Sequence, residues 1–372
     1  MAIYRIFPEK DTFIYTEAIK GNAGLDEIIE IGGYLVSEVG QTSRALLKFN
    51  DTDVANVVSN IIGSNNYSAS IHLSLATAYE IPTEYSIKAY PVYEPWVQGI
   101  GKFGDSPVDE SGVSWTYRLG KQDGRWTLRS NTVNMPAGVT GSYNATYSGG
   151  GGNWYTGSAG INFESTQLQE LNSNNDIHIN VTNGVKAHVA GTIVNNGFIL
   201  KLTDDLEFNT SSSIRLKYFS GNTNTIYPPY LEFGWNDTVY NSNLTELSTS
   251  NATINIKNNK GEYVDNGKQR FRIHARPRYP TRTFSTGSVY LTNYKLPANS
   301  YWGLRDEHTE EMVVDFNTAF TKISADNNGS YFDVYMEGLQ PERYYRILVK
   351  STLDGSTTVV DNGNVFKIVR NG

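Results

Sequence analysis

The chain has 372 residues, a formal net charge of −7 and no cysteine. The lack of cysteine excludes disulfide frameworks, thiolate metal sites and cysteine nucleophiles, and the acidic balance argues against nonspecific nucleic-acid binding. No stretch approaches the roughly 18 apolar residues that a membrane span needs. The N-terminus, MAIYRIFPEK, carries charges and a proline, so we expect no secretory signal and synthesis in a cytoplasm.

Alternating apolar and polar residues are the main pattern along the chain and predict β-strands. In the stretch 69–76, Ile71, Leu73 and Leu75 fall on one face of an extended segment. The same alternation recurs in residues 199–202, 214–218 and 230–233.

Helical periodicity is clear only between Asp53 and Gly63, which we interpret as the N-cap and the stop of a helix. Apolar residues there recur three and four positions apart, at Val54, Val57, Val58, Ile61 and Ile62. A second, shorter helix is expected after Thr182. The elements together predict an all-β protein with one or two short helices.

Residues 99–104 read Gly-Ile-Gly-Lys-Phe-Gly, which matches the G-x-G-x-x-G pattern of dinucleotide-binding turns. That pattern binds a pyrophosphate only between a buried strand and the N-terminus of a helix. Pro91 and Pro95 stand where the strand should be, and no helical periodicity follows. We therefore interpret the region between Trp96 and Trp115 as a long loop whose two indoles clamp it to the sandwich.

Other motif candidates also have structural explanations. Residues 149–152 are four glycines without a following Gly-Lys-Ser/Thr, which indicates a flexible loop. Asp326-Asn-Asn-Gly329 fits a hairpin turn better than a calcium loop. No G-x-S-x-G is present and the sequence nominates no pair of catalytic carboxylates, so we expect no enzymatic activity and no cofactor.

The histidines show no spacing typical of metal ligands, so the sequence nominates no metal site. A site assembled from distant strands stays open. The histidines are His72, His178, His188, His274 and His308.

Two regions are separable along the chain. Residues 1–236 form the first, the polar stretch 237–252 is a linker, and residues 253–372 contain short strands separated by turns, which predict a compact β-sandwich. The strands expected there span residues 254–257, 270–276, 288–291, 311–316, 331–336, 344–350 and 366–369. Residues 338–347, GLQPERYYRI, resemble the segment of fibronectin type III domains in which a leucine fills the core before a tyrosine-rich strand.

Four arginines near position 274 form an alternating basic pattern: Arg270, Arg272, Arg276 and Arg278. Phe271, Ile273 and Ala275 occupy the intervening positions, so an extended strand puts the basic side chains on the opposite face from the apolar ones. One interpretation is a solvated face balanced by nearby acids. The other is a docking surface for an acidic neighbouring subunit.

Read in order, the first region resembles the DNRLRE domain, a jelly-roll-like β-sandwich of bacterial surface proteins, polysaccharide-degrading enzymes and phage structural proteins. The resemblance places the glycines of residues 99–104 in the W-x-x-G loop of that family, a structural turn. The matching stretches are 11–14, 21–24 through 30–32, 44–49, 96–99, 112–115, 176–182, 196–201, 218–220 and 225–232.

Three stretches of the second region resemble virion structural proteins of tailed phages: FRIHARPRYPTRTF, DEHTEEMVVDFN and GSYFDVYMEGLQPERYYRI. The two resemblances imply a jelly-roll-like sandwich followed by an immunoglobulin- or fibronectin-III-like sandwich. They also imply a structural component of a tailed-bacteriophage virion, in its neck, tail or head decoration. We expect such a protein to assemble in the bacterial host cytoplasm, with other virion proteins and copies of itself as partners and without membrane or nucleic acid.

Carbohydrate binding is the alternative function that the first resemblance implies. Exposed aromatic rings stack on sugar rings, and the candidates on loops or strand ends are Trp115, Trp126, Trp154 and Tyr155. Most tryptophans in such sandwiches serve instead as core residues or loop clamps.

Overall fold

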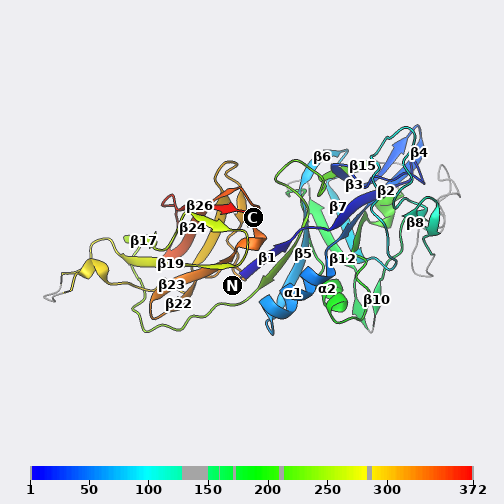
Figure 1. Cartoon of the computed structure of the whole chain (residues 1–372). Coiled ribbons are helices and arrows are strands. Elements are labelled where there is room, and N and C mark those ends of the chain that lie inside the picture. Colours follow the sequence, from blue (N-terminus) through cyan, green and yellow to red (C-terminus); the bar gives the residue numbers. More distant parts are fainter. Residues whose placement is uncertain are drawn as a thin grey trace. The chain divides into compact units, whose positions relative to one another are not determined.

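The computed structural model describes residues 2–127, 150–158, 160–170, 173–208, 213–282 and 287–370. Strands in several sheets dominate and the few helices are short, which confirms the all-β prediction. The chain divides into two compact units (Figure 1). The N-terminal unit comprises Ile6–Ile61 and Ser68–Glu232, and the C-terminal unit comprises Met1–Arg5, Ile62–Tyr67 and Phe233–Gly372.

The largest sheet belongs to the N-terminal unit and has the strand order β12-β7-β14-β4-β3-β15-β6, with β2 also paired to β4. Neighbouring strands are antiparallel. In chain order the strands are β2 (Lys10–Tyr15), β3 (Ile28–Val36), β4 (Val39–Lys48), β6 (Leu75–Tyr79), β7 (Glu84–Pro91), β12 (Ser165–Glu170), β14 (Phe198–Leu202) and β15 (Ile214–Phe219).

A second sheet has the order β1-β16-β5-β13. Its strands are β1 (Ala2–Ile6), β5 (Tyr67–Leu73), β13 (Ile177–Asn180) and β16 (Tyr230–Trp235). The N-terminal unit also contains two short hairpins. One pairs β8 (Tyr117–Gly120) with β9 (Asp123–Arg125), and the other pairs β10 (Gly157–Ser158) with β11 (Ile161–Asn162).

The first predicted helix is present, but it begins earlier than expected. Helix α1 (Asp51–Asn56) continues into a π-helical segment (Val57–Ile62). Its N-cap is Asn50, whose side-chain oxygen accepts hydrogen bonds from the backbone N–H groups of Thr52 and Asp53. The prediction of Asp53 as the cap is therefore wrong, because the amide three residues earlier already satisfies these donors.

The second predicted helix is also present, as α2 (Thr182–Val189). A third helix, α3 (Asp204–Glu207), occupies a single turn that the sequence did not reveal.

The glycine-rich loop after Trp96 wraps around Asn22. The Asn22 side-chain oxygen accepts a hydrogen bond from the backbone N–H of Gly101 at 2.9 Å, and its amide donates to the Val113 carbonyl at 3.0 Å. A Cβ on Gly99 would lie 2.3 Å from that same oxygen, at a φ of +79°. The glycines thus serve close packing, which confirms the structural-turn interpretation.

The C-terminal unit contains two sheets. The first has the order β17-β19-β23-β22 and the second β18-β26-β24-β20-β21, with β25 paired to β24 (Figure 1). The first comprises β17 (Ala252–Ile256), β19 (Lys268–Pro277), β22 (Ser324–Asp326) and β23 (Gly329–Tyr335). The second comprises β18 (Glu262–Val264), β20 (Tyr301–Asp306), β21 (Met312–Val314), β24 (Tyr344–Leu353), β25 (Ser356–Val360) and β26 (Val365–Val369).

Aromatic rings from both of these sheets form one core. Phe332 of β23 stacks on Trp302 of β20 with ring centroids 5.1 Å apart, and Phe271 of β19 contacts Phe366 of β26 at 5.5 Å. All four side chains are buried. Side chains of two sheets that interdigitate in this way define a β-sandwich.

The polar stretch 237–252, which the sequence predicts as a linker, packs on this unit. Leu247 is buried in its core, and the hydroxyl of Tyr240 donates to the Leu296 carbonyl at 2.6 Å. The hairpin predicted at Asp326-Asn-Asn-Gly329 is confirmed, with Asp326 and Gly329 as cross-strand partners.

One predicted strand of this unit is wrong. Residues 288–291 contain the 3-10 turn Val289–Leu291.

The part of the chain that the structure describes contains no helix long and apolar enough to cross a membrane.

Candidate protein-contact site on the C-terminal unit

The arginines of β19 lie on the face opposite to the core, as the alternation predicts. Phe271, Ile273 and Ala275 are at most 1% exposed, and Arg270 and Arg272 alternate with them. β19 is paired on both sides, with β17 and with β23. The cross-strand neighbours of the arginines therefore decide how much of their charge reaches solvent.

Arg270 is compensated by its direct cross-strand partner, Asp333 of β23. The Arg270 Nε and Nη2 atoms lie 2.8 and 3.0 Å from the two carboxylate oxygens of Asp333. Lys268 reaches the same carboxylate at 2.9 Å. Burial alone would raise the pKa of Asp333, but the hydrogen bonds from Arg270 and Lys268 lower that pKa below its usual value.

Arg272 is compensated in the same way by Asp326 of β22. Its Nη1 and Nη2 atoms lie 3.0 and 2.9 Å from the Asp326 carboxylate oxygens. These hydrogen bonds lower the pKa of Asp326 against the opposing effect of burial. The Tyr331 ring lies 4.1 Å from the Arg270 guanidinium carbon and 5.4 Å from that of Arg272. These two arginines fit the interpretation of a solvated face balanced by acids.

Arg276 and Arg278 lie at the other end of the arginine pattern and differ from the first pair. Within the described ranges neither forms an ion pair with a carboxylate. The Arg276 Nη1 donates to the carbonyls of Pro277 and Arg278 at 3.0 and 3.3 Å. Its guanidinium carbon lies 5.0 Å from the centroid of the Tyr290 ring. Only this second pair keeps its positive charge available to a partner.

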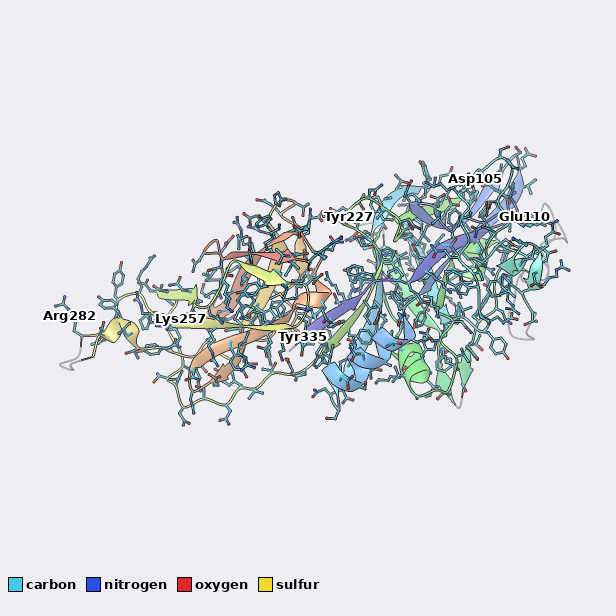
Figure 2. The ribbon with its side chains drawn as sticks, viewed as in Figure 1. Asp105, Glu110, Tyr227, Lys257, Arg282 and Tyr335 are labelled. Atoms are coloured by element: carbon cyan, nitrogen blue, oxygen red, sulfur yellow. The ribbon has the colours of Figure 1, made fainter. Side chains whose placement is uncertain are left out.

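The segment that follows β19 extends this positive charge. Residues 276–295 contain three arginines, one lysine and no acidic residue, in a chain whose net charge is −7. Figure 2 shows Arg282 at the outer end of this segment, at the opposite end of β19 from Tyr335. The same segment exposes large side chains with apolar surface: Tyr279 and Leu291 are 78% exposed each, and Tyr290 is 55% exposed.

We call this region the basic aromatic surface. It consists of Arg276, Arg278, Tyr279, Arg282, Tyr290 and Leu291.

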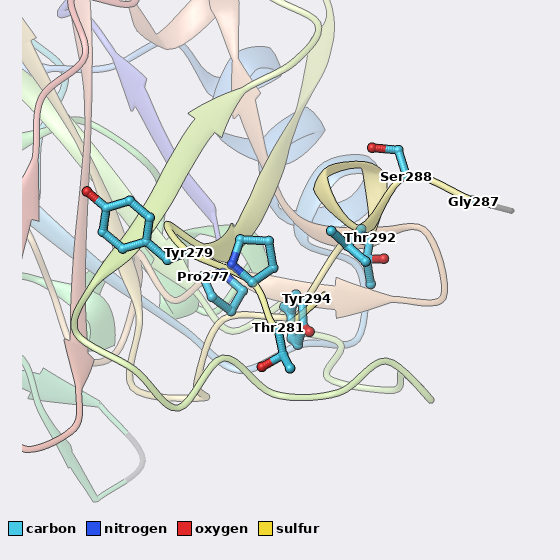
Figure 3. Close-up of a pocket in the computed structure, with 9 residues that line it drawn as sticks. Pro277, Tyr279, Thr281, Gly287, Ser288, Thr292 and Tyr294 are labelled. Atoms are coloured by element: carbon cyan, nitrogen blue, oxygen red, sulfur yellow. The ribbon is translucent and has the colours of Figure 1, made fainter. Parts of the chain in front are cut away.

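A hollow of about 440 Å³ adjoins the basic aromatic surface (Figure 3). Its base is fixed on β19, because the backbone N–H of Tyr294 donates to the Ala275 carbonyl at 2.8 Å and the Asn293 side chain accepts from the Ala275 N–H at 3.0 Å. The hollow is lined by Pro277, Tyr279, Pro280, Thr281, Gly287, Ser288, Val289, Thr292 and Tyr294.

The tryptophans proposed to stack on sugars are buried in the N-terminal unit. Trp115, Trp126 and Trp154 are at most 4% exposed and belong to one core cluster with Trp96. The Trp126 Nε1 donates to the Ser114 carbonyl at 3.1 Å. A buried indole has no free face for a sugar ring, so the prediction is wrong for these three residues. Their role as core residues and loop clamps is confirmed.

The fourth proposed sugar-binding residue, Tyr155, is half-buried. Its ring meets Tyr93 and Phe163 edge-on, with centroids 4.8 and 6.5 Å away. These neighbours hold the ring within an aromatic group of the same unit.

The structure also brings together residues that the sequence did not nominate. His72, His178 and Glu232 offer ligand atoms that all lie within 4.8 Å of one another. All three residues belong to the N-terminal unit and come from three adjacent strands of one sheet. This group is able to hold a metal ion and is separate from the basic aromatic surface.

No family model matches the chain, and no curated protein matches it. Among solved structures, the chain is similar to a DUF4785 family protein of Legionella pneumophila, with 7% sequence identity and a TM-score of 0.20. The similarity covers 97% of this chain and 65% of the Legionella chain, so the protein spans less than two thirds of that relative's length. A likeness at this level carries no argument about function.

Proposed function

We propose that the protein is a structural component of a tailed-bacteriophage virion and acts through contacts with other virion proteins and with copies of itself. The basic aromatic surface is the observation that carries the proposal. Tyr279, Tyr290 and Leu291 are each exposed within residues 276–295, and aromatic residues with arginine are enriched in the energetically dominant centres of protein interfaces.

The charge of this surface determines the kind of partner. Residues 276–295 are basic and the remainder of the chain is acidic. An acidic surface of a neighbouring protein, including another copy of this chain, is therefore complementary to it. A stable contact needs roughly 800 Å² from each partner.

Location in the particle is the first test. Mass spectrometry of purified phage particles should find the protein in a fixed ratio to the other structural proteins, and a cryo-EM map should contain the sandwich of the C-terminal unit. Absence of the protein from intact particles would refute the proposal.

Charge reversal tests the surface itself. The double variant Arg278→Glu/Arg282→Glu should lower incorporation into particles, because both side chains are exposed and basic. Lys257→Glu/Lys260→Glu is the matched control, since it changes the charge equally at exposed positions outside the surface. Equal incorporation of both variants would exclude the basic aromatic surface as the contact.

Carbohydrate recognition is the second candidate, and a different residue from those first considered favours it. The Tyr279 ring is 78% exposed and borders the hollow of about 440 Å³. A glycan array with the wild-type protein and Tyr279→Ala distinguishes the two functions. Specific retention that is lost in Tyr279→Ala supports sugar binding, and no retention leaves protein contact as the function of this surface.

A further inference from the structure

Three side chains of the N-terminal unit converge on one face of a sheet. His72 lies on β5, His178 on β13 and Glu232 on β16, and β5 lies between the other two strands. His72 and His178 are direct cross-strand partners, which places their Cβ atoms about 4.5–5.5 Å apart.

The two-residue period of a strand explains why these side chains share a face. Ile71, Ile179 and Leu231 stand next to them in the three strands and are at most 1% exposed. Because successive side chains point to opposite faces, burial of these neighbours directs His72, His178 and Glu232 away from the core.

Contacts within the group hold His72 in place. Its ring stacks on His178 with centroids 3.9 Å apart and on Tyr230 with centroids 4.5 Å apart and planes 13° apart. The Nε2 atom of His72 lies 3.8 Å from an oxygen of Glu232. The His72 and Glu232 side chains are only 17% and 16% exposed, so the ligand atoms lie in a partly enclosed setting.

Two imidazoles and one carboxylate form a ligand set suited to zinc and similar transition metals, whereas calcium and magnesium prefer oxygen ligands. Tetrahedral zinc with bonds of about 2.0–2.2 Å needs ligand atoms roughly 3.4 Å apart. The three ligand atoms lie within 4.8 Å of one another, so side-chain rotations that move them by about 1 Å suffice.

We propose that His72, His178 and Glu232 bind a divalent transition-metal ion of the zinc class. Three protein ligands leave one tetrahedral position for water or for a donor atom of a partner. The ion cross-links strands β5, β13 and β16, which are far apart in the sequence. It therefore stabilises the N-terminal unit.

Calorimetric titration of the tag-free, chelator-treated protein tests the site. We expect one zinc ion bound per chain and a higher melting temperature in zinc, because a ligand that binds only the folded state stabilises it. Cobalt should occupy the same site with the strong visible absorption of a tetrahedral ion. Calcium and magnesium should not compete. No binding at about 100 µM zinc, a concentration at which any site of micromolar affinity is filled, overturns the proposal.

Single substitutions identify the ligands. Glu232→Gln keeps the size of the side chain and His178→Ala removes an exposed ring, and each should weaken zinc binding by more than about tenfold, because even residues behind metal ligands contribute that much. His308→Ala is the control, since His308 is an exposed histidine of the other unit. Unchanged affinity in both site variants refutes the site.

Folding of the variants is checked by their urea midpoints in chelator, which should match that of the wild type. Should a variant fail this check, the cobalt spectrum of the wild-type protein decides the question, because octahedral or absent absorption excludes a tetrahedral site.

Discussion

Arg44 and Glu207 form a buried ion pair in the N-terminal unit. The Arg44 Nε and Nη2 atoms lie 2.5 and 2.9 Å from the two carboxylate oxygens of Glu207, and both side chains are 0% exposed. Lys201 reaches the same carboxylate at 2.8 Å. The guanidinium carbon lies 4.8 Å from the Trp115 ring and 5.3 Å from the Trp154 ring. Two of the indoles expected on the surface, those of Trp115 and Trp154, thus lie against a buried cation.

Removal of one partner of this ion pair should destabilise the protein strongly. We expect Arg44→Met to lower the free energy of unfolding by about 3–5 kcal/mol, because it leaves the Glu207 charge buried with fewer partners. Arg272→Met is the matched control. It removes a two-point ion pair with Asp326 that is about 30% exposed and should cost at most about 1 kcal/mol. Equilibrium urea denaturation measures both, and equal losses would contradict the argument from burial.

Asp11 should make the N-terminal unit less stable as the pH rises. Burial raises the pKa of Asp11 to about 6, against the lowering effect of the hydrogen bond from the Gly221 N–H. A carboxyl whose pKa is higher in the folded state binds its proton more tightly there, so its contribution to stability falls between about pH 4 and pH 6. Asp11→Asn should therefore raise the free energy of unfolding at pH 7 by on the order of 2–3 kcal/mol.

The measurement for Asp11 is urea denaturation at several pH values. The difference between Asp11→Asn and the wild type should shrink toward zero at about pH 4. A difference that does not change with pH would show that Asp11 is not protonated in this range.

His188 should have the opposite effect to Asp11, because it should make the N-terminal unit less stable as the pH falls. Burial lowers the pKa of His188 to about 4, and its ring lies against Phe198 with centroids 5.3 Å apart. The unfolded chain binds a proton near pH 6.5 that the folded chain rejects, so stability is lost as the pH falls from about 6.5 to 4. His188→Gln should remove this loss and leave the opposite effect of Asp11, so the urea midpoint of the variant should be higher at pH 5 than at pH 7, whereas the two midpoints of the wild type should differ little.

The two titrations partly cancel in the wild type because they have opposite slopes over the same range. Asp11→Asn should therefore expose the acid sensitivity due to His188. The double variant with His188→Gln should be nearly flat. A steep remaining slope in the double variant would assign the pH response to other groups.

Local patterns in the sequence were sufficient to predict much of the fold. The two-residue period of β19 places Phe271 in the core and Arg270 outside it, and the DNNG stretch forms the predicted turn. These features depend on neighbouring residues alone. The prediction of a strand at residues 288–291 was wrong. Its apolar residues follow a strand-like pattern, but they form a 3-10 turn in which Tyr290 and Leu291 are exposed.

The candidate sites depended on partners distant in the sequence, which no local pattern reveals. Compensation of Arg270 by Asp333 follows from the register of β19 and β23. His72 and Glu232 meet through the strand order β16-β5-β13. For Trp115, Trp126 and Trp154 the sequence offered both burial in the core and exposure for sugar binding, and it did not decide between them. Strand pairing has to be known before such contacts can be named.

The hydroxyl of Tyr345 should contribute more to the stability of the C-terminal unit than the hydroxyl of its neighbour Tyr344. The Tyr345 hydroxyl accepts from the Gln340 N–H at 2.9 Å and lies 3.1 Å from the Gln340 carbonyl. This bond back to the preceding loop resembles the tyrosine corner found in immunoglobulin-like sandwiches. The ring is 2% exposed, so Tyr345→Phe leaves two backbone groups without their partner and should cost about 1–3 kcal/mol.

Tyr344→Phe removes the same atom from a ring that is 41% exposed and should change the free energy of unfolding by less than about 0.5 kcal/mol. Urea denaturation of both variants at neutral pH makes the comparison. Similar small losses would mean that water replaces the Tyr345 hydroxyl, and the loop after Leu339 would then be held by the burial of that leucine, which is 5% exposed. A large loss for Tyr345→Phe alone assigns the closure of the loop to the hydroxyl, because the two substitutions differ only in burial and hydrogen bonding.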